Sequence, residues 1–248
     1  MNITLSVDTY KGVDGSSLSP TRCNQIVQVY EMLELFGDKP MTYIKVQEEA
    51  EKRKLFGETN ARSAIRTFFP LLKKLGFVIY DDTFNANDCF TELGTQFVLA
   101  CRALNNVSDS TPHKEDIIQR LENIKQSAQK QGLVTMYLNK EYEKHNMWVA
   151  LKLLKEFPVM SWNVFLYALH CLEKGLSLEE SIEEIRTERE KIDSMIFVNE
   201  DGEKLPNTCY SYIRSFLEEA GIIKKVSSKE SELVNPSDKI FKIGRAHV

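Results

Sequence analysis

The chain has 248 residues, of which 42% are hydrophobic and 27% are charged, a composition typical of a globular protein with one or two domains. No apolar run reaches the roughly 20 residues that cross a bilayer, and the first residues lack the basic and apolar parts of a secretory signal, so we expect a soluble cytoplasmic protein. The net charge of −4 excludes a generic polyanion-binding protein, because neutralising phosphates requires clustered Lys and Arg.

The cysteines are scattered singly along the chain, without a Cys-x-x-Cys pair, and only four histidines accompany them. We therefore expect neither a zinc site nor a disulfide framework, and no cofactor in this chain. An odd, dispersed set of thiols is typical of a reducing compartment, where cysteines serve as small core residues. The five are Cys23, Cys89, Cys101, Cys171 and Cys209.

Charge is unevenly distributed along the chain. Residues 59–80 hold four cations and no acid, residues 177–203 hold ten acids against three bases, and residues 204–245 hold eight bases against five acids. Two separate segments thus carry a positive excess. The acidic stretch between them is expected to face away from any polyanion.

Residues 1–20 contain glycines, serines and a proline, and we interpret them as a flexible arm. Ser19 and Pro20 then provide the chemistry of a helix start. Apolar residues recur after them at three- and four-residue steps, so a first helix should end at Gly37. A second helix is expected over residues 42–55.

The third helix, which Thr59 or Asn60 can cap, divides its residues between two faces. One face is apolar, with Ile65, Phe68, Leu72 and Leu75, and another is basic, with Arg62, Arg66 and Lys73. A helix that enters a DNA groove needs this division. Because Pro70 lacks an amide proton and crowds the preceding turn, we expect a kink or break near Phe69.

A strand over residues 77–80, a loop over 81–88 and a return strand at 89–90 follow, and Thr91 then opens another helix. The order of helix, strand, loop, strand and helix is that of a winged helix. We therefore assign residues 21–105 to a first winged helix.

A helical connector is expected over residues 106–200. It ends in an acidic helix over residues 177–193, which begins with a capping box at Ser177. We interpret the charge run of this helix as a solvated face, and whether it binds a protein partner stays open.

A second winged helix is expected over residues 201–242, with strands at 222–226 and 239–242 on either side of a loop at 227–238. It repeats the first block, but the matching stretches sit in registers three residues apart, which indicates a structural repeat. Residues 243–248 are interpreted as the translation of a sequencing adapter, which would truncate this unit. The predicted fold is therefore mainly α with small β-hairpins (α+β).

Short motifs agree with one known group. They are Ile26-Val27-Gln28-Val29-Tyr30, Leu75-Gly76-Phe77, Thr91-Glu92-Leu93-Gly94 and, more weakly, residues 153–158 and 220–225. Through them the chain resembles the DNA-recognition region of type IIS restriction endonucleases of the FokI kind. The resemblance implies tandem winged helices that read double-stranded DNA, with a cleavage domain elsewhere in the full-length protein.

By position, the resemblance assigns base reading to Arg62 and Arg66 in the first unit and to Asn207, Ser211 and Arg214 in the second. Arg can hold guanine O6 and N7 bidentately, Asn and Ser choose other base edges, and lysines contact phosphates. The predicted DNA-binding residues are Asn60, Arg62, Ser63, Arg66, Lys73, Asn207, Ser211, Arg214, Lys224 and Lys225, with Lys229 as a further phosphate contact. Asp81, Asp82 and Asp88 depart from this pattern, because an acidic wing would repel phosphates.

A restriction-type nuclease needs an Asp-x-Lys or Glu-x-Lys motif to hold Mg²⁺ and orient water, and the chain has neither. His145-Asn146 has no second histidine nearby, so we do not expect an HNH site and interpret His145 as a polar surface histidine. We thus predict a sequence-specific DNA-binding portion of a type II restriction endonuclease without its nuclease domain, where Mg²⁺ would serve only that missing domain. Two alternatives stay open, a winged-helix transcription or replication regulator and a protein-interaction module.

Overall fold

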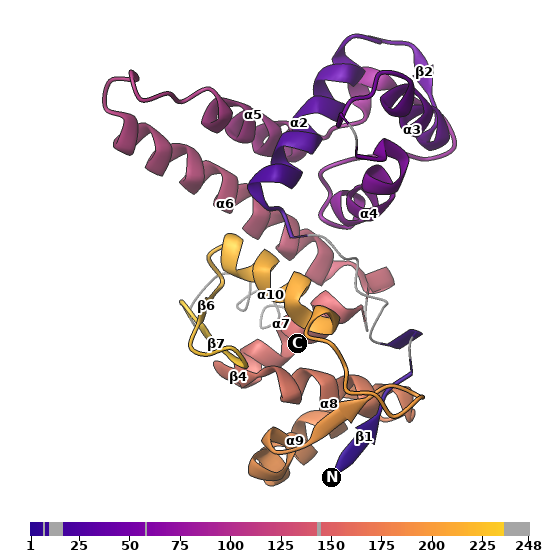
Figure 1. Cartoon of the computed structure of the whole chain (residues 1–248), viewed down its shortest axis with the longest axis vertical. Helices are drawn as coiled ribbons and strands as arrows, with labels where there is room; N and C mark the ends of the chain where they lie inside the picture. Colours follow the sequence, from indigo (N-terminus) through magenta and orange to yellow (C-terminus); the bar gives the residue numbers. More distant parts are fainter. Residues whose placement is uncertain (7, 10–16, 58, 143–144, 236–248) are drawn as a thin grey trace. The chain divides into compact units, whose positions relative to one another are not determined.

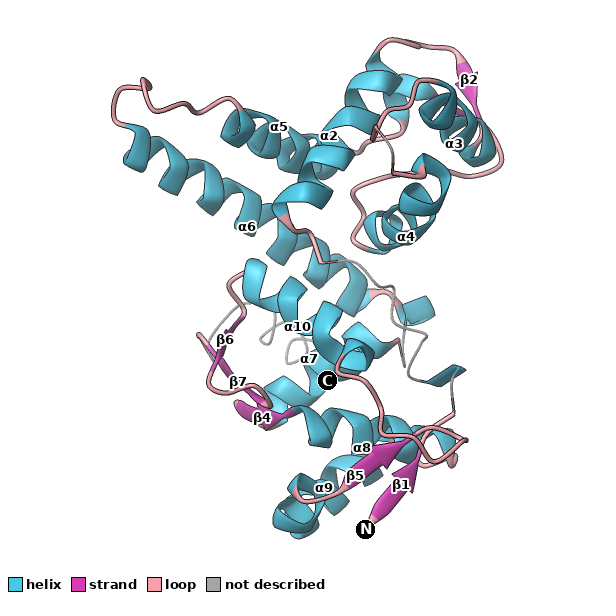
Figure 2. Cartoon of the chain, viewed as in Figure 1, coloured by secondary structure: helices cyan, strands magenta, loops and turns pink. Residues whose placement is uncertain are grey.

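The computed structural model of the chain describes residues 1–6, 8–9, 17–57, 59–142 and 145–235. The fold is mainly α-helical with small strands, as the sequence predicted (Figures 1 and 2). The chain forms two compact units: residues 1–15 and 139–248 make unit 1, and residues 16–138 make unit 2. None of the helices in the described ranges is long and apolar enough to cross a membrane.

Unit 2 is built from helices and one small sheet. Its elements are α2 (Pro20–Glu34), β2 (Pro40–Met41), α3 (Tyr43–Lys52), α4 (Ala61–Lys74), β3 (Phe84–Asn85), a 3₁₀ turn (Ala86–Asp88), α5 (Glu92–Asn105) and α6 (Lys114–Leu138). The side chains of Ser19, Thr42, Asn60 and Thr91 each accept a hydrogen bond from a first-turn amide. These caps fix where α2, α3, α4 and α5 begin.

The hairpin expected after α4 is shorter than predicted. Residues 77–80 and 89–90 meet only at a bridge between Val78 and Phe90 and at a hydrogen bond from the Ile79 N–H to the Cys89 carbonyl, 2.7 Å long. The sheet of unit 2 instead pairs β3 antiparallel with β2, which lies between α2 and α3. A two-residue strand has no detectable periodicity, so the sequence did not reveal β2.

The predicted break in the third helix is wrong, because α4 runs unbroken through Pro70. Phe68, Phe69, Leu71 and Leu72 surround the proline and are all buried. A proline inside a helix costs about 3 kcal/mol, and a buried leucine or phenylalanine contributes about 1.5–3 kcal/mol each. Packing of the apolar face therefore outweighs the missing hydrogen bond.

The segment expected as a connector does not form one element. Its first helix, α6, lies beside α5 in unit 2 (Figure 1). Gly132 of α6 lies so close to the loop after α4 that an added Cβ would be 2.9 Å from the Phe77 ring and 3.0 Å from the Leu75 carbonyl oxygen. Residues 114–138 therefore belong to the core of unit 2, and the later helices belong to unit 1.

Unit 1 contains two small sheets and four principal helices among its described residues. The elements are β1 (Asn2–Thr4), a 3₁₀ turn (Lys140–Tyr142), α7 (Asn146–Glu156), β4 (Val159–Ser161), α8 (Trp162–Glu173), α9 (Leu178–Asp193), β5 (Ile196–Val198), α10 (Thr208–Glu219), β6 (Ile223–Lys225) and β7 (Glu230–Leu233).

The start of the chain corrects the prediction of a flexible arm. β1 pairs in parallel with β5, and Ile3 and Leu5 are buried. The alternation of apolar and polar residues from Asn2 to Ser6 is the pattern of a half-buried strand, and it outweighs the glycine-rich composition that follows. Residues 7 and 10–16 of the expected arm lie outside the described residues.

The second sheet has the strand order β4-β7-β6 and is antiparallel throughout. β7 falls within the segment 227–238 that was expected to be a loop, while the expected return strand 239–242 and the end 243–248 lie outside the described residues. β4 comes from the supposed connector. The boundary predicted at residue 201 is therefore wrong.

Trp162 shows how tightly these parts share one core. Its ring is stacked on Tyr210 of α10 with centroids 5.1 Å apart, and its Nε1–H donates to the Ser231 hydroxyl of β7 over 3.2 Å. The two units share an order of elements: a helix, a strand, two helices and then strands. In unit 2 these are α2, β2, α3, α4 and the strands after it. In unit 1 they are α7, β4, α8, α10, β6 and β7, with α9 and β5 inserted between α8 and α10. In both units the first strand of this series pairs with the last.

Candidate nucleic-acid interface

α4 buries one side and exposes the other, as its pattern predicted. Seven residues face the core: Ala61, Ala64, Ile65, Phe68, Phe69, Leu71 and Leu72. The opposite side carries what we call the α4 stripe, made of Arg62, Ser63, Arg66 and Lys73; Arg62 is half-exposed and the others are exposed. Asn60 acts as the N-cap, since its Oδ1 accepts the Ser63 N–H over 2.8 Å.

Arg62 is held by acids of the neighbouring helix α3. Its Nε lies 2.7 Å from Glu51 Oε2, and its Nη2 lies 3.8 Å from Glu48 Oε1. In the free protein these carboxylates neutralise the guanidinium. Arg62 can meet a base or a phosphate only after this ion pair opens.

Lys73 is held near the acidic loop that follows α4. Its Nζ lies 4.9 Å from the centre of the Tyr80 ring, donates to the Tyr80 carbonyl over 3.3 Å and lies 3.6 Å from Asp81. Asp81, which was expected to repel phosphates from the wing, therefore also forms an ion pair with Lys73 of the α4 stripe. This geometry weakens the prediction that Lys73 contacts phosphate.

Arg66 is the cation of the α4 stripe that stays available. Its Nε–H donates to the Arg62 carbonyl over 3.5 Å, and within the described part of the chain no carboxylate lies within ion-pair distance of it. Tyr43 lies close enough for the Arg66 charge to act on it: burial raises the pKa of Tyr43, and the Arg66 charge opposes that rise. Arg66 thus combines exposure with an uncompensated charge.

An aromatic stack lies beside Arg66 that could not be predicted from the sequence. The rings of Tyr43 and Tyr80 are stacked with centroids 4.8 Å apart, and Tyr43 is also stacked on Phe69 at 5.8 Å. The stack joins the start of α3, the middle of α4 and the loop after it. The place of Tyr43 directly after the Thr42 cap was the only available signal, and it does not reveal which residues the ring meets.

In unit 1 the prediction that Arg214 reads bases is wrong, because the residue is only 8% exposed. Its Nη1 donates to the Ser228 carbonyl over 2.8 Å, and its Nη2 donates to the carbonyls of Ser227 at 2.7 Å and Glu230 at 3.3 Å. Its Nε lies 3.1 Å from Glu218 Oε1. The side chain is buried among apolar residues of α10, and the carbonyls of the β6–β7 turn accept hydrogen bonds from its guanidinium.

The other predicted residues of unit 1 are accessible to different degrees. Asn207 is exposed, and its Oδ1 accepts a hydrogen bond from the Tyr210 hydroxyl over 3.1 Å. Ser211 is half-exposed. Lys224 and Lys225 are both exposed, and Lys224 forms a 3.0 Å ion pair with Glu232 across the strands. These residues and the α4 stripe belong to different units, so each is treated as a separate surface.

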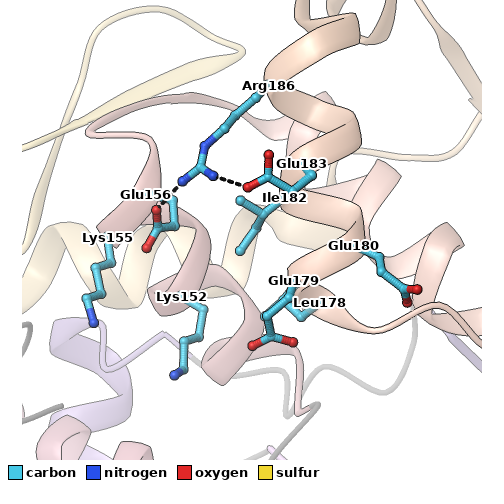
Figure 3. A pocket seen from close by; sticks show the side chains of 9 residues that line it. All are labelled: Lys152, Lys155, Glu156, Leu178, Glu179, Glu180, Ile182, Glu183 and Arg186. Carbon is cyan, nitrogen blue, oxygen red and sulfur yellow. Dashed lines mark hydrogen bonds and ion pairs between the residues drawn. The ribbon is translucent and has the colours of Figure 1, made fainter. Parts of the chain in front are cut away.

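A hollow of about 580 Å³ lies between α7 and α9 of unit 1 (Figure 3). Leu178 and Ile182 form its apolar part, while the charged rim mixes lysines and glutamates. Figure 3 shows Arg186 between Glu156 and Glu183, with ion pairs to both. Because acids outnumber cations around the rim, this hollow is a poor place for a phosphate. The glutamates of α9 that line it are exposed, as predicted for a solvated face.

His145, expected as a polar surface histidine, keeps part of its surface exposed, whereas its neighbour Asn146 does not. Asn146 is buried at the start of α7, and its Nδ2 donates to the Thr9 carbonyl over 3.3 Å, while His145 is half-exposed. Among the described residues, no group of three or more His, Cys, Asp or Glu side chains is arranged to hold a metal ion. Cys23, Cys89, Cys101 and Cys171 are buried, as predicted for cysteines that serve as small core residues.

Comparisons of the chain with families of proteins, with curated proteins and with solved structures find no match.

Proposed function

We propose that the chain binds double-stranded DNA through the α4 stripe of unit 2, with Arg66 as the principal contact. The observation that carries this proposal is an exposed arginine without an acidic partner, on a capped helix that directly follows another helix. The major groove is wide enough to admit one helix, and an arginine projecting from it can reach guanine O6 and N7. Ser63 lies one turn before Arg66 on the same face and can contact a base edge or a phosphate.

The proposal includes sequence specificity and a place in a restriction endonuclease, both of which rest on the motifs. In this chain two of those motifs lie in contact. The Thr91 hydroxyl donates to the Gly76 carbonyl over 2.7 Å and accepts the Gly94 N–H over 3.0 Å. The Leu-Gly-Phe and Thr-x-x-Gly motifs are thus hydrogen-bonded to each other at the two ends of the loop, and this supports the interpretation of unit 2 as a winged helix.

The test begins by selecting bound duplexes from a randomised pool, because the recognition site is unknown. Arg66→Ala should then weaken binding to the selected site by about 1–3 kcal/mol, or roughly 5- to 150-fold, if Arg66 reads a base. Arg66→Lys keeps the charge but loses the bidentate fork, so it should lose most of the discrimination between the selected site and random DNA.

Lys52→Ala is the matched control, since it removes one positive charge from a 78% exposed side chain of the adjacent helix α3. It should change affinity far less than Arg66→Ala. A pool from which no duplex is enriched would refute sequence specificity. Unchanged binding by the Arg66→Ala variant would refute the assignment of α4.

A second candidate function is docking of a protein partner on the same side of unit 2. The exposed apolar residues Ile44 and Ile79, 66% and 53% exposed, flank Tyr43 and Tyr80, and Arg62 is already neutralised. Salt separates the two functions. DNA binding should weaken steeply between 50 and 200 mM salt, as expected when phosphate contacts release counterions, while apolar docking should not.

A further inference from the structure

Arg214 is a buried cation with an uncommon set of acceptors. Three of the four groups it engages are main-chain carbonyls in or beside one turn, those of Ser227, Ser228 and Glu230. A buried charge persists when hydrogen bonds replace its hydration, and the planar guanidinium donates in fixed directions. Arg214 therefore holds the connection between β6 and β7 in one conformation.

This clamp also decides where the amides of the turn point. In a trans peptide the C=O and the next N–H lie on opposite sides of the plane. Because the carbonyls of Ser227 and Ser228 are drawn to Arg214, the N–H groups of Ser228 and Lys229 point away from it. The Lys229 N–H donates to the Ser227 hydroxyl over 3.2 Å, and the Ser228 N–H has no acceptor among the described residues.

The outer side of the turn has the charge that an anion requires. Lys225 and Lys229 are exposed, and residues 225–229 contain no acid; the carboxylate of the next residue, Glu230, accepts a hydrogen bond from the Ser227 hydroxyl over 3.4 Å. The Ser228 hydroxyl is exposed as well. The Ser228 N–H, which is not donated within the described part of the turn, can therefore donate to an anion in a segment that carries two lysines.

We propose that Arg214 is a positioning residue, which fixes the β6–β7 turn so that its tip, residues 225–229, binds the phosphate backbone of duplex DNA. This inference rests on the proposed function, but it assigns the contact to a different unit and a different kind of element. The two turns differ in charge: the turn of unit 2 carries Asp81 and Asp82, whereas the tip in unit 1 carries two lysines and no acid. A phosphate contact adds affinity that does not depend on sequence, whereas base reading is assigned to α4.

The first experiment measures anisotropy of a labelled random-sequence duplex over 50 to 200 mM salt. The double variant Lys225→Ala/Lys229→Ala changes two exposed side chains, so the fold should be kept. Losing two phosphate contacts should reduce the salt slope by about 1.8 and weaken binding up to about 60-fold at 0.1 M salt. Lys174→Ala, which removes an exposed lysine at the end of α8, should have little effect.

The second experiment combines these variants with Arg214→Lys, which keeps a charge but cannot donate to three carbonyls in the same fork. Arg214→Lys alone should lose much of the contribution of the tip. In the background of Lys225→Ala/Lys229→Ala it should cause little further loss, because a positioning residue acts only through what it positions. Amide exchange over residues 226–230 should accelerate in Arg214→Lys without DNA.

The outcomes separate this inference from the proposed function. If Arg66→Ala weakens binding while Lys225→Ala/Lys229→Ala does not, the proposed function stands and the role of the tip is refuted, whether or not the Arg214 variant folds. If the losses from Arg214→Lys and the lysine variant simply add, Arg214 does not act through the tip. If the wild type binds no duplex at all, both ideas are refuted.

Discussion

Gly94 provides a stringent test of how unit 2 is assembled. A Cβ added to this residue of α5 would lie 1.9 Å from the Phe77 carbonyl oxygen and 2.7 Å from its carbonyl carbon. An ordinary contact is at least 3.4 Å. In the Gly94→Ala variant, α5 and the segment after α4 must therefore move apart by about 1.5 Å. Thr91 opposes this movement through its hydrogen bonds to Gly76 and Phe77.

The expected cost follows from these contacts. Overpacking costs about 1–3 kcal/mol, and losing the hydrogen bonds of Thr91 adds about 1 kcal/mol for each. We therefore expect Gly94→Ala to lower the free energy of unfolding of unit 2 by about 3–5 kcal/mol. Gly37→Ala is the matched control: its φ is +59° and nothing lies within 4 Å of the added Cβ, so it should cost only the backbone strain of about 1–2 kcal/mol.

Urea unfolding followed by far-UV circular dichroism measures both variants. Tryptophan fluorescence reports on the other unit, because Trp148 and Trp162 both lie in unit 1. Equal losses for the Gly94 and Gly37 variants would refute the close approach of α5 to Phe77.

Two further predictions concern charge and ionisation. Glu51→Gln removes the nearer partner of Arg62, and if Arg62 then contacts one phosphate, duplex binding should tighten by roughly 8-fold at 0.1 M salt; unchanged or weaker binding in an anisotropy titration would contradict this. Burial raises the pKa of Cys89 from 9.0 to about 12, so the folded state keeps its proton while the unfolded state loses it. Stability should therefore fall as pH rises above 9, by about 1.4 kcal/mol per pH unit from this thiol, and Cys89→Ala should flatten the fall in urea unfolding between pH 8 and 10.5. A slope that Cys89→Ala leaves unchanged would contradict the assignment to this residue.

Local chemistry predicted the helices well. The starts of α2, α4, α5 and α9 follow from cap residues whose acceptors the sequence displays, and Ser177 with Glu180 forms the expected capping box. Pairing between distant segments was not predictable in this way. β1 with β5, and β4 with β7, are three-residue contacts whose partners are chosen by packing of the whole unit.

The candidate site shows the same division. The helical periodicity of α4 correctly placed Arg62, Arg66 and Lys73 on the accessible side. It could not show that Glu51 holds Arg62 or that Asp81 lies near Lys73, because those acids come from other elements. The prediction for Arg214 failed for a related reason. Helical periodicity places a residue on a face, but the carbonyls that accept hydrogen bonds from Arg214 belong to a turn more than ten residues later.

The parallel pair of β1 and β5 has a consequence for biosynthesis. β1 can pair only after residues 196–198 have been made, and at about 5–20 residues per second their synthesis follows that of β1 after on the order of 10–40 s. Unit 2 is contiguous in sequence and can fold during that interval, while the apolar side chains of Ile3 and Leu5 stay uncovered. Nascent chains arrested before residue 196 should accordingly contain a protease-resistant fragment spanning residues 16–138 and a start that proteases remove.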